Sequence, residues 1–164
     1  MILTSKACWR GTSEHWLGTD GLGRDFWARL AYGARISLLI GIMAAVISGI
    51  IGSTLGILAG YFGGRVDMVV TFLINVRLAM PVVLVALAVV ALFGGSLTVV
   101  VSVLGLLLWD RFAVVLRSAT MQVRKQEYVA AAEVLGASLP RILVKDILPN
   151  VMNPLIVVAT LEVA

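Results

Sequence analysis

One stretch in the first half of the chain decides its structural class: ARISLLIGIMAAVISGIIGSTLGILAG, residues Ala34–Gly60. It contains a single charged residue, Arg35, at its edge. An α-helix needs about 20 predominantly apolar residues to cross the hydrocarbon core of a bilayer. The stretch is longer than this, so we predict that it forms a transmembrane helix.

The composition of the whole chain extends this prediction beyond one helix. Of the 164 residues, 60% are hydrophobic and 13% are charged, about half of the charged fraction of a typical soluble domain. A chain with so little polar surface cannot face water on all sides. We therefore predict an all-α integral membrane protein, a polytopic bundle of transmembrane helices in contact with membrane lipid. The net charge of +4 forms no basic face with interleaved aromatic residues, so nucleic acid is not an expected partner.

The residue pattern does not indicate a catalytic site, a disulfide or a metal site. The chain has one cysteine, Cys8, and one histidine, His15, so neither an intrachain disulfide nor a Cys/His metal site is expected. The polar residues within the apolar runs form no catalytic triad or acid–base pair. The candidates for an intramembrane enzyme are Ser48, Ser53, Thr54, Asn75 and Arg77. We predict no catalytic, cofactor-binding or metal-binding residue in this chain.

The first apolar run carries glycines at a helical spacing. Gly52, Gly56 and Gly60 follow one another every four residues, which places three small residues on one face of a helix. Such a face lets a neighbouring helix approach closely. We favour packing inside one subunit as the reason for this face, over a dedicated dimerisation motif.

Two further apolar runs follow, each interrupted by residues unusual for a membrane span. The run Val69–Phe93 includes Arg77 and Pro81. We interpret Arg77 as a boundary charge that reaches toward the headgroups, with a substrate contact as the alternative, and we expect Pro81 to kink the helix.

The third run extends from Leu97 to Trp109 and toward Leu116. Its strictly apolar part is short for a span. Asp110 and Arg111, which follow Trp109, are expected either near a membrane interface or toward the interior of the bundle. Trp109 itself suits the aromatic belt at the interface.

The order of the runs predicts the sides of the membrane. Three spans place residues 1–33, which lack the apolar core of a signal peptide, opposite the polar stretch 117–150. The loop at 61–68 then falls on the same side as 117–150, and the excess of Lys and Arg there predicts that this side is cytoplasmic. The apolar residues 151–164 provide only about half a span, so we interpret the sequence as a fragment cut at its C-terminus.

The segment EYVAAAEVLGASLPRILVKDILPN, residues Glu127–Asn150, has its own internal pattern. We predict a short helix from Glu127 to Leu135, a stop at Gly136, and a second, amphipathic helix along the membrane face. Ser138 would cap the second helix, with Pro140 in its first turn and Pro149 ending it before the next span. Spacing alone leaves two readings open, a docking surface for a partner or a solvated loop with none.

Residues in this segment carry a resemblance. Ala131-Ala132, Gly136 and Ile147-Leu148-Pro149 match the spacing of the "EAA" loop in permease subunits of binding-protein-dependent ABC importers. Glu127-Tyr128 resembles the Glu-Tyr-Val lead-in of the peptide class. The chain departs from the pattern at Ala130, where the family has Glu.

Further motifs resemble the dipeptide, oligopeptide and nickel permeases. They are Leu17-Gly18-Thr19-Asp20, Leu22-Gly23-Arg24-Asp25, Tyr32-Gly33-Ala34-Arg35, and Ala59-Gly60-Tyr61-Phe62-Gly63-Gly64 with Asp67 and Ala79-x-Pro81. Family members often carry an Arg and an acidic residue before this proline. Here Phe72 and Asn75 stand in those places and Arg77 is displaced, so a role for that polar pair is not carried over. Together the motifs cover nearly the whole chain.

The resemblance implies an incomplete permease of the type I ABC importer kind. Residues 1–33 would be an extracytoplasmic polar segment, and 34–164 a partial transmembrane domain with a cytoplasmic coupling loop at about 117–150. The location implied is the plasma membrane of a bacterium or archaeon. The residues implied to couple to the ATPase are Glu127, Tyr128, Ala131, Ala132, Gly136, Leu148 and Pro149.

The resemblance also implies partners. No Gly-x-x-x-x-Gly-Lys-Ser/Thr motif occurs in the sequence, so ATP would be bound and hydrolysed by separate ABC ATPase subunits, and this chain would not be an enzyme. A second permease subunit and an extracytoplasmic solute-binding protein would complete the importer. The solute would be a peptide or a related small solute such as nickel. The alternative is a small membrane channel or scaffold protein outside the ABC class, with an interfacial amphipathic helix.

Overall fold

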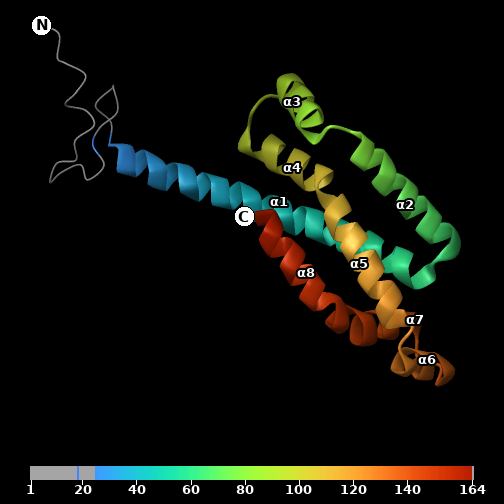
Figure 1. Ribbon diagram of the computed structural model, residues 1–164. Helices are drawn as coiled ribbons and strands as arrows, with labels where there is room; N and C mark the ends of the chain where they lie inside the picture. The colour runs from blue at the N-terminus through green and yellow to red at the C-terminus, as the bar shows by residue number, and fades with distance from the viewer. Residues whose placement is uncertain (1–17, 19–24, 164) are drawn as a thin grey trace, which may run out of the picture. The chain divides into compact units, whose positions relative to one another are not determined.

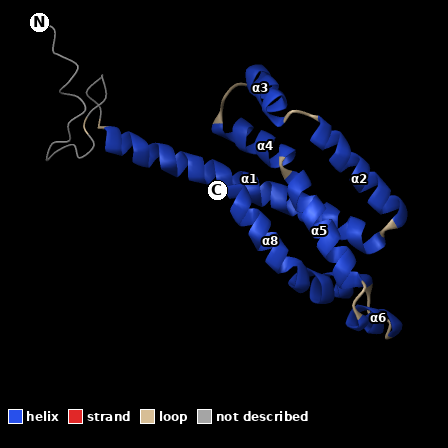
Figure 2. Cartoon of the chain, in the orientation of Figure 1, coloured by secondary structure: helices blue, strands red, loops and turns tan. Residues whose placement is uncertain are grey.

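The computed structural model describes Gly18 and residues 25–163. Every regular element in this part of the chain is a helix (Figure 2), which confirms the all-α prediction. The elements are α1 (Phe26–Phe62), α2 (Gly64–Ala79), α3 (Val82–Phe93), α4 (Leu97–Leu107), α5 (Trp109–Arg124), α6 (Glu127–Val134), α7 (Leu139–Arg141), the π-helical turn η1 (Ile142–Ile147) and α8 (Leu148–Val163).

The chain divides into two compact units, residues 1–39 and 40–164. In the first unit, α1 begins at Phe26, eight residues before the run from which we predicted it. The Asp25 carboxylate accepts a hydrogen bond of 2.9 Å from the Trp27 backbone N–H, as a residue at a helix start does. The predicted polar segment 1–33 therefore ends in helix, while residues 1–17 and 19–24 lie outside the described residues.

Several helices are long and apolar enough to cross a membrane. Three qualify in the described residues: Phe26–Phe62, Leu97–Arg124, which joins α4 and α5, and Leu139–Val163, which joins α7, η1 and α8. The count rises to four if α2 and α3, which are bent relative to each other, are taken together as one span. These helices confirm a polytopic membrane protein.

The predicted kink at Pro81 is a sharp break. The axes of α2 and α3 differ by 79°, with Met80 in extended conformation between them. Proline has no N–H to donate and disfavours helical geometry in the residue before it, which explains why the helix stops there. After the break, α3 packs against α4 (Figure 1).

The glycine face of α1 packs against α5, as predicted for contacts inside one subunit. A methyl group on Gly52 would lie 2.2 Å from the Trp109 carbonyl oxygen, and one on Gly56 would lie 2.6 Å from the carbonyl oxygen of Ala113. No side chain fits at such distances. The two helices can therefore meet this closely only with glycine at these positions.

Trp109 does not lie in an interfacial belt. It starts α5 near the middle of the span Leu97–Arg124 and packs against a buried cluster of small and branched residues. The cluster consists of Ala59, Val70, Ile74 and Ala113. The prediction failed because α4 and α5 together form one span, so the short apolar run Leu97–Trp109 is only its first half.

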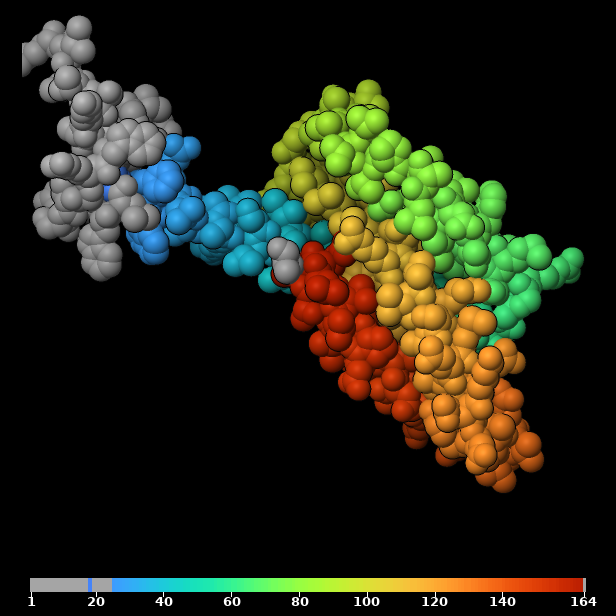
Figure 3. Space-filling model, in the orientation of Figure 1, coloured from blue at the N-terminus to red at the C-terminus, as the bar shows by residue number. Residues whose placement is uncertain are grey.

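One expected helix end in the C-terminal half is also wrong, and the polar stretch starts within a helix. The polar stretch expected from Arg117 begins inside α5, which continues to Arg124. Pro149 does not end its helix, because α8 runs on from Leu148 to Val163. The preceding turn η1 is π-helical, and the Leu148 N–H bonds five residues back to Leu143. This wider turn accommodates the proline, as π-bulges do elsewhere. The helix therefore continues into α8, which lies along α5, while α6 lies at the end of α5 (Figure 3).

Candidate functional site

Helix α6 presents an exposed apolar face. It forms where the short helix was predicted, and Val129 is its fully buried residue. On the outer side Tyr128 is 44% exposed, while Val134 and Leu135 are 88% and 86% exposed. Large apolar side chains left this open on a segment predicted to lie outside the membrane form a typical contact surface for a partner.

Helix α6 is tied to the membrane helices by its inner side. The Tyr61 hydroxyl, at the end of α1, donates a hydrogen bond of 2.9 Å to the Glu133 carboxylate. The Arg124 guanidinium lies 5.1 Å from the centre of the Tyr61 ring, a cation–π contact between α5 and α1. Val129 belongs to the same buried cluster as Tyr61 and Leu116. Sequence reasoning missed the Tyr61–Glu133 contact, because 72 residues separate its partners.

These contacts also settle one prediction about topology. Tyr61 and Asp67 flank the short connection between α1 and α2, and they contact Glu133 and Arg117 respectively. The connection therefore lies on the same side as the end of α5 and helix α6, as the count of spans predicted.

Gly136 ends α6 in the manner predicted for a helix stop. Its φ is +74°, and the N–H groups of Gly136 and Ala137 bond back to the carbonyl oxygens of Glu133 and Ala132, both at 3.0 Å. This is the arrangement of a helix C-cap with glycine in the left-handed region. An added Cβ would meet nothing within 4 Å, so glycine is required here by backbone conformation and not by space.

A pocket lies between α6 and the next helix. Its volume is about 510 Å³, and it is lined by Ala132, Leu135, Gly136, Ala137, Ser138, Arg141 and Asp146. Ser138 starts the next helix as predicted, because its carbonyl oxygen accepts from the Arg141 and Ile142 N–H groups. Its side chain makes no capping hydrogen bond.

The residues implied to couple to an ATPase separate into two groups. Glu127, Tyr128, Ala131, Gly136 and Pro149 are exposed. Ala132 and Leu148 are half-buried and pack against the cluster around Leu116, Val129 and Ile147. The first group can touch a partner directly, while the second holds the segment against the bundle.

A two-pronged ion pair joins the first turn of α2 to the middle of α5. The Arg117 side chain donates to both oxygens of Asp67, through Nη2 at 2.7 Å and through Nε. Thr71 contacts the same carboxylate at 3.5 Å. Arginine suits this geometry because its planar fork matches a carboxylate. The pair fixes the start of α2 to α5.

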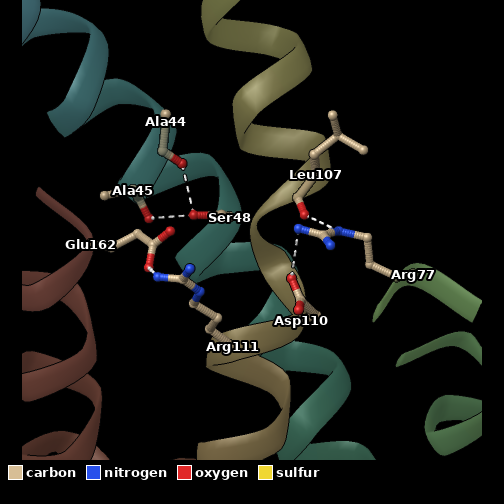
Figure 4. Close-up of polar contacts among 8 residues, drawn as sticks. All are labelled: Ala44, Ala45, Ser48, Arg77, Leu107, Asp110, Arg111 and Glu162. Carbon is tan, nitrogen blue, oxygen red and sulfur yellow. Dashed lines mark hydrogen bonds and ion pairs between the residues drawn. The ribbon is translucent and has the colours of Figure 1, made fainter. Parts of the chain in front are cut away.

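A second ion pair corrects the interpretation of Arg77. Arg77 is 9% exposed and does not reach toward headgroups. Its Nη2 lies 3.2 Å from Asp110 Oδ1, and its Nε donates to the Leu107 carbonyl oxygen (Figure 4). Asp110 is 3% exposed and thus faces the bundle interior. Arg77 therefore pairs with an acidic residue on another helix. A local sequence pattern could not indicate this pairing.

A third ion pair joins α5 to α8. Arg111 Nη1 lies 3.0 Å from Glu162 Oε2, and the two side chains are 64% and 5% exposed. Figure 4 shows Arg77 and Arg111 on opposite sides of α5, each with its own carboxylate. Of the two expectations for the neighbours Asp110 and Arg111, the interior one holds for Asp110, while Arg111 is exposed in the middle of a span.

The described part of the chain is characterised by ion pairs between helices and by an exposed helix surface. In the part of the chain that the structure describes, no three His, Cys, Asp or Glu residues gather as metal ligands. What the geometry provides is a set of membrane helices held by ion pairs, with an outward-facing helix anchored to them.

Comparison with known proteins identifies a family that this chain matches. The family model "Binding-protein-dependent transport system inner membrane component" matches residues 52–164.

Curated relatives are similar over nearly the whole chain. The dipeptide transport system permease protein DppC of Bacillus subtilis is 41% identical over 152 residues, which are 93% of this chain and 48% of the relative. The oligopeptide transport system permease protein OppC of B. subtilis and the glutathione transport system permease protein GsiD of Pectobacterium atrosepticum are each 36% identical over 152 residues, 93% of this chain and 50% of theirs. This chain thus spans about half the length of the curated relatives it matches.

Proposed function

Because this chain belongs to the family of binding-protein-dependent transport system inner membrane components, a multi-pass family of the plasma membrane, we propose that it forms part of a permease subunit of an ABC importer. The subunit lines part of the translocation path, and ATP is hydrolysed elsewhere. Separate ABC ATPase subunits, a second permease subunit and an extracytoplasmic solute-binding protein are its proposed partners. The 127–150 segment is the proposed point of coupling.

The observation that carries this proposal is the attachment of α6. Its outer face is exposed and apolar, and its inner face is bound to α1 through the Tyr61–Glu133 hydrogen bond and the buried Val129. A partner that moves α6 therefore pulls on α1 and, through the shared buried cluster, on α5 and α8. This is the mechanical connection that an importer needs between ATP-driven motion and its membrane helices.

We propose a short peptide as the solute, rather than nickel. The relatives described above are named for dipeptide, oligopeptide and glutathione transport. The motifs in this chain are shared between the peptide and nickel classes, so the names of the relatives are what favours a peptide.

The test uses Gly136 in the subunit that carries this chain, reconstituted in liposomes with its ATPase subunits and binding protein. Gly136→Val places a β-branched residue at a φ of +74°, where such residues are strained. We expect ATP hydrolysis to persist while uptake of a radiolabelled dipeptide falls at least severalfold. Gly136→Asn is the matched control, because asparagine tolerates this conformation.

Two results would contradict the proposal. Uptake by Gly136→Val at the wild-type rate would remove the coupling role of the segment. A wild-type subunit that copurifies with no ATPase would instead favour the alternative, a channel or scaffold protein outside the ABC class.

A further inference from the structure

Arg111 occupies an unusual position for a charged residue. It lies near the middle of the 28-residue span Leu97–Arg124, yet its side chain is 64% exposed. Arg77 and Asp110 lie close to the same depth, but both are buried and paired inside the bundle. Arg111 therefore needs an explanation that Arg77 does not.

Lipid is an unfavourable environment for this guanidinium. Placing Arg at the centre of a membrane helix costs about 2.5–3.5 kcal/mol on insertion scales. An arginine side chain in a membrane helix usually extends toward the headgroups, which begin about 15 Å from the bilayer midplane. Arg111 instead stays bound to Glu162, at 3.0 Å. Intramembrane charges in this situation almost always face protein or a water-filled cavity.

The carboxylate of Glu162 holds the guanidinium in place. Glu162 is 5% exposed, so it is the buried member of the pair, while Arg111 is the open one. A guanidinium has five N–H donors in a planar fork, and the contact with Glu162 uses Nη1. Among the described residues Glu162 is the partner found for this guanidinium, and its remaining N–H groups suit a planar, two-oxygen acceptor.

An apolar groove begins beside this pair. Its volume is about 340 Å³, and it lies between α1, α5 and α8. Phe112 and Val163, the next residues after Arg111 and Glu162, are part of its lining. The groove therefore lies one residue along α5 and α8 from the ion pair, although neither charged side chain lines it. That combination fits a solute with an apolar side chain and a carboxylate.

We propose that Arg111 faces the aqueous translocation path and binds the C-terminal carboxylate of the passing peptide. Glu162 is the positioning residue that orients the guanidinium. This inference rests on the proposed function, because it names the chemical group of the solute that the membrane-spanning part recognises.

The first test is water access to position 111. The chain has one cysteine, Cys8, so a Cys8→Ser background carries a single introduced thiol. Arg111→Cys is made together with Glu162→Gln, because a buried carboxylate without its partner would destabilise the fold. In the assembled importer we expect a charged, lipid-insoluble methanethiosulfonate reagent to modify Cys at 111, and excess dipeptide to slow the reaction. Leu116→Cys is the control, since Leu116 is fully buried on the same helix.

The second test is selectivity for the carboxylate. Uptake of Ala-Phe and of its C-terminal amide is measured for wild type, Arg111→Gln and Arg111→Gln/Glu162→Gln. Loss of a hydrogen bond to a charged group predicts about a tenfold fall for the free carboxylate, with little change for the amide. Arg111→Lys should restore part of the uptake of the free peptide, because it keeps the charge but not the fork.

The outcomes separate this inference from the proposed function. No dipeptide uptake by the wild-type importer would overturn the function itself. Normal wild-type uptake with equal losses for both peptides in the Arg111 variants would show a structural role only and overturn the inference. A thiol at 111 that reacts no faster than the one at 116 would also overturn it.

Discussion

The guanidinium of Arg77 ties together two places where the membrane helices break. It lies 3.2 Å from Asp110 and also binds the carbonyl oxygen of Leu107. Leu107 ends α4 one residue before the break at Leu108, and Asp110 is in the first turn of α5. Arg77 itself stands in the last turn before the break at Pro81. One side chain thus donates to a helix-end carbonyl and forms an ion pair with a buried carboxylate, close to the breaks that precede α3 and α5.

We expect the Arg77–Asp110 pair to be strongly coupled. Arg77→Met or Asp110→Leu alone leaves one buried charge without a partner, which typically costs about 3–5 kcal/mol. The double variant removes both charges and should lose much less than the sum of the two. The free energy of unfolding in mixed detergent micelles measures this cycle, and strictly additive losses would refute the coupling.

Close packing between α1 and α5 predicts different effects for two neighbouring glycines. Gly52→Ala brings a methyl group 2.2 Å from the Trp109 carbonyl oxygen, so a helix must move, at about 1–3 kcal/mol. Gly49→Ala meets its nearest atom, on Phe112, at 3.5 Å, an ordinary contact, and gains helix propensity. Thermal unfolding of both variants tests the difference. Equal stability would show that the two helices are not held at this distance.

The hydrogen bond between Tyr61 and Glu133 should restrain α6. Tyr61→Phe removes the hydroxyl and keeps the ring, at a cost of about 0.5–1.5 kcal/mol. Amide hydrogen exchange in residues 127–134 should then accelerate. Tyr128→Phe, on the exposed side of the same helix, is the control and should leave exchange unchanged. Identical exchange in the two variants would mean that the bond does not anchor the helix.

The Asp67–Arg117 pair should be weaker and more sensitive to salt than the buried pair. Its side chains are 22% and 29% exposed, so water and ions screen the attraction. Asp67→Asn should cost about 1 kcal/mol at low salt and less at high salt, as measured by unfolding in detergent. Arg65, exposed near the start of α2, supplies the control Arg65→Gln. A salt-independent loss larger than that of Asp110→Leu would reverse this ranking.

Features that depend on neighbouring residues could be predicted from the sequence. The apolar runs indicated the spans, the four-residue glycine spacing indicated the contact face of α1, and Gly136 indicated the end of α6. Each follows from the length of an apolar run, the period of a helix or the freedom of glycine, and none needs a distant partner.

The continuation of the helix past Pro149 and the burial of Arg77 could not be predicted from neighbouring residues. Proline commonly ends a helix, but the π-helical turn before Pro149 lets this one continue. An arginine near the end of an apolar run commonly reaches for the headgroups, but Arg77 has Asp110 within reach. In both cases the local preference was overridden by the surroundings in the folded chain.

Among the candidate site residues the same division holds. The sequence by itself determined that the chain is a helical membrane protein with an interrupted polar segment at 127–150, because hydropathy and helix signals are local. Only the tertiary structure decided that Tyr61 anchors Glu133, that Arg77 is buried with Asp110, and that Arg111 stands open beside Glu162. The physical reason is that a charge in a membrane is tolerable only with a partner, and these partners lie 30 or more residues away, on helices that folding brings together.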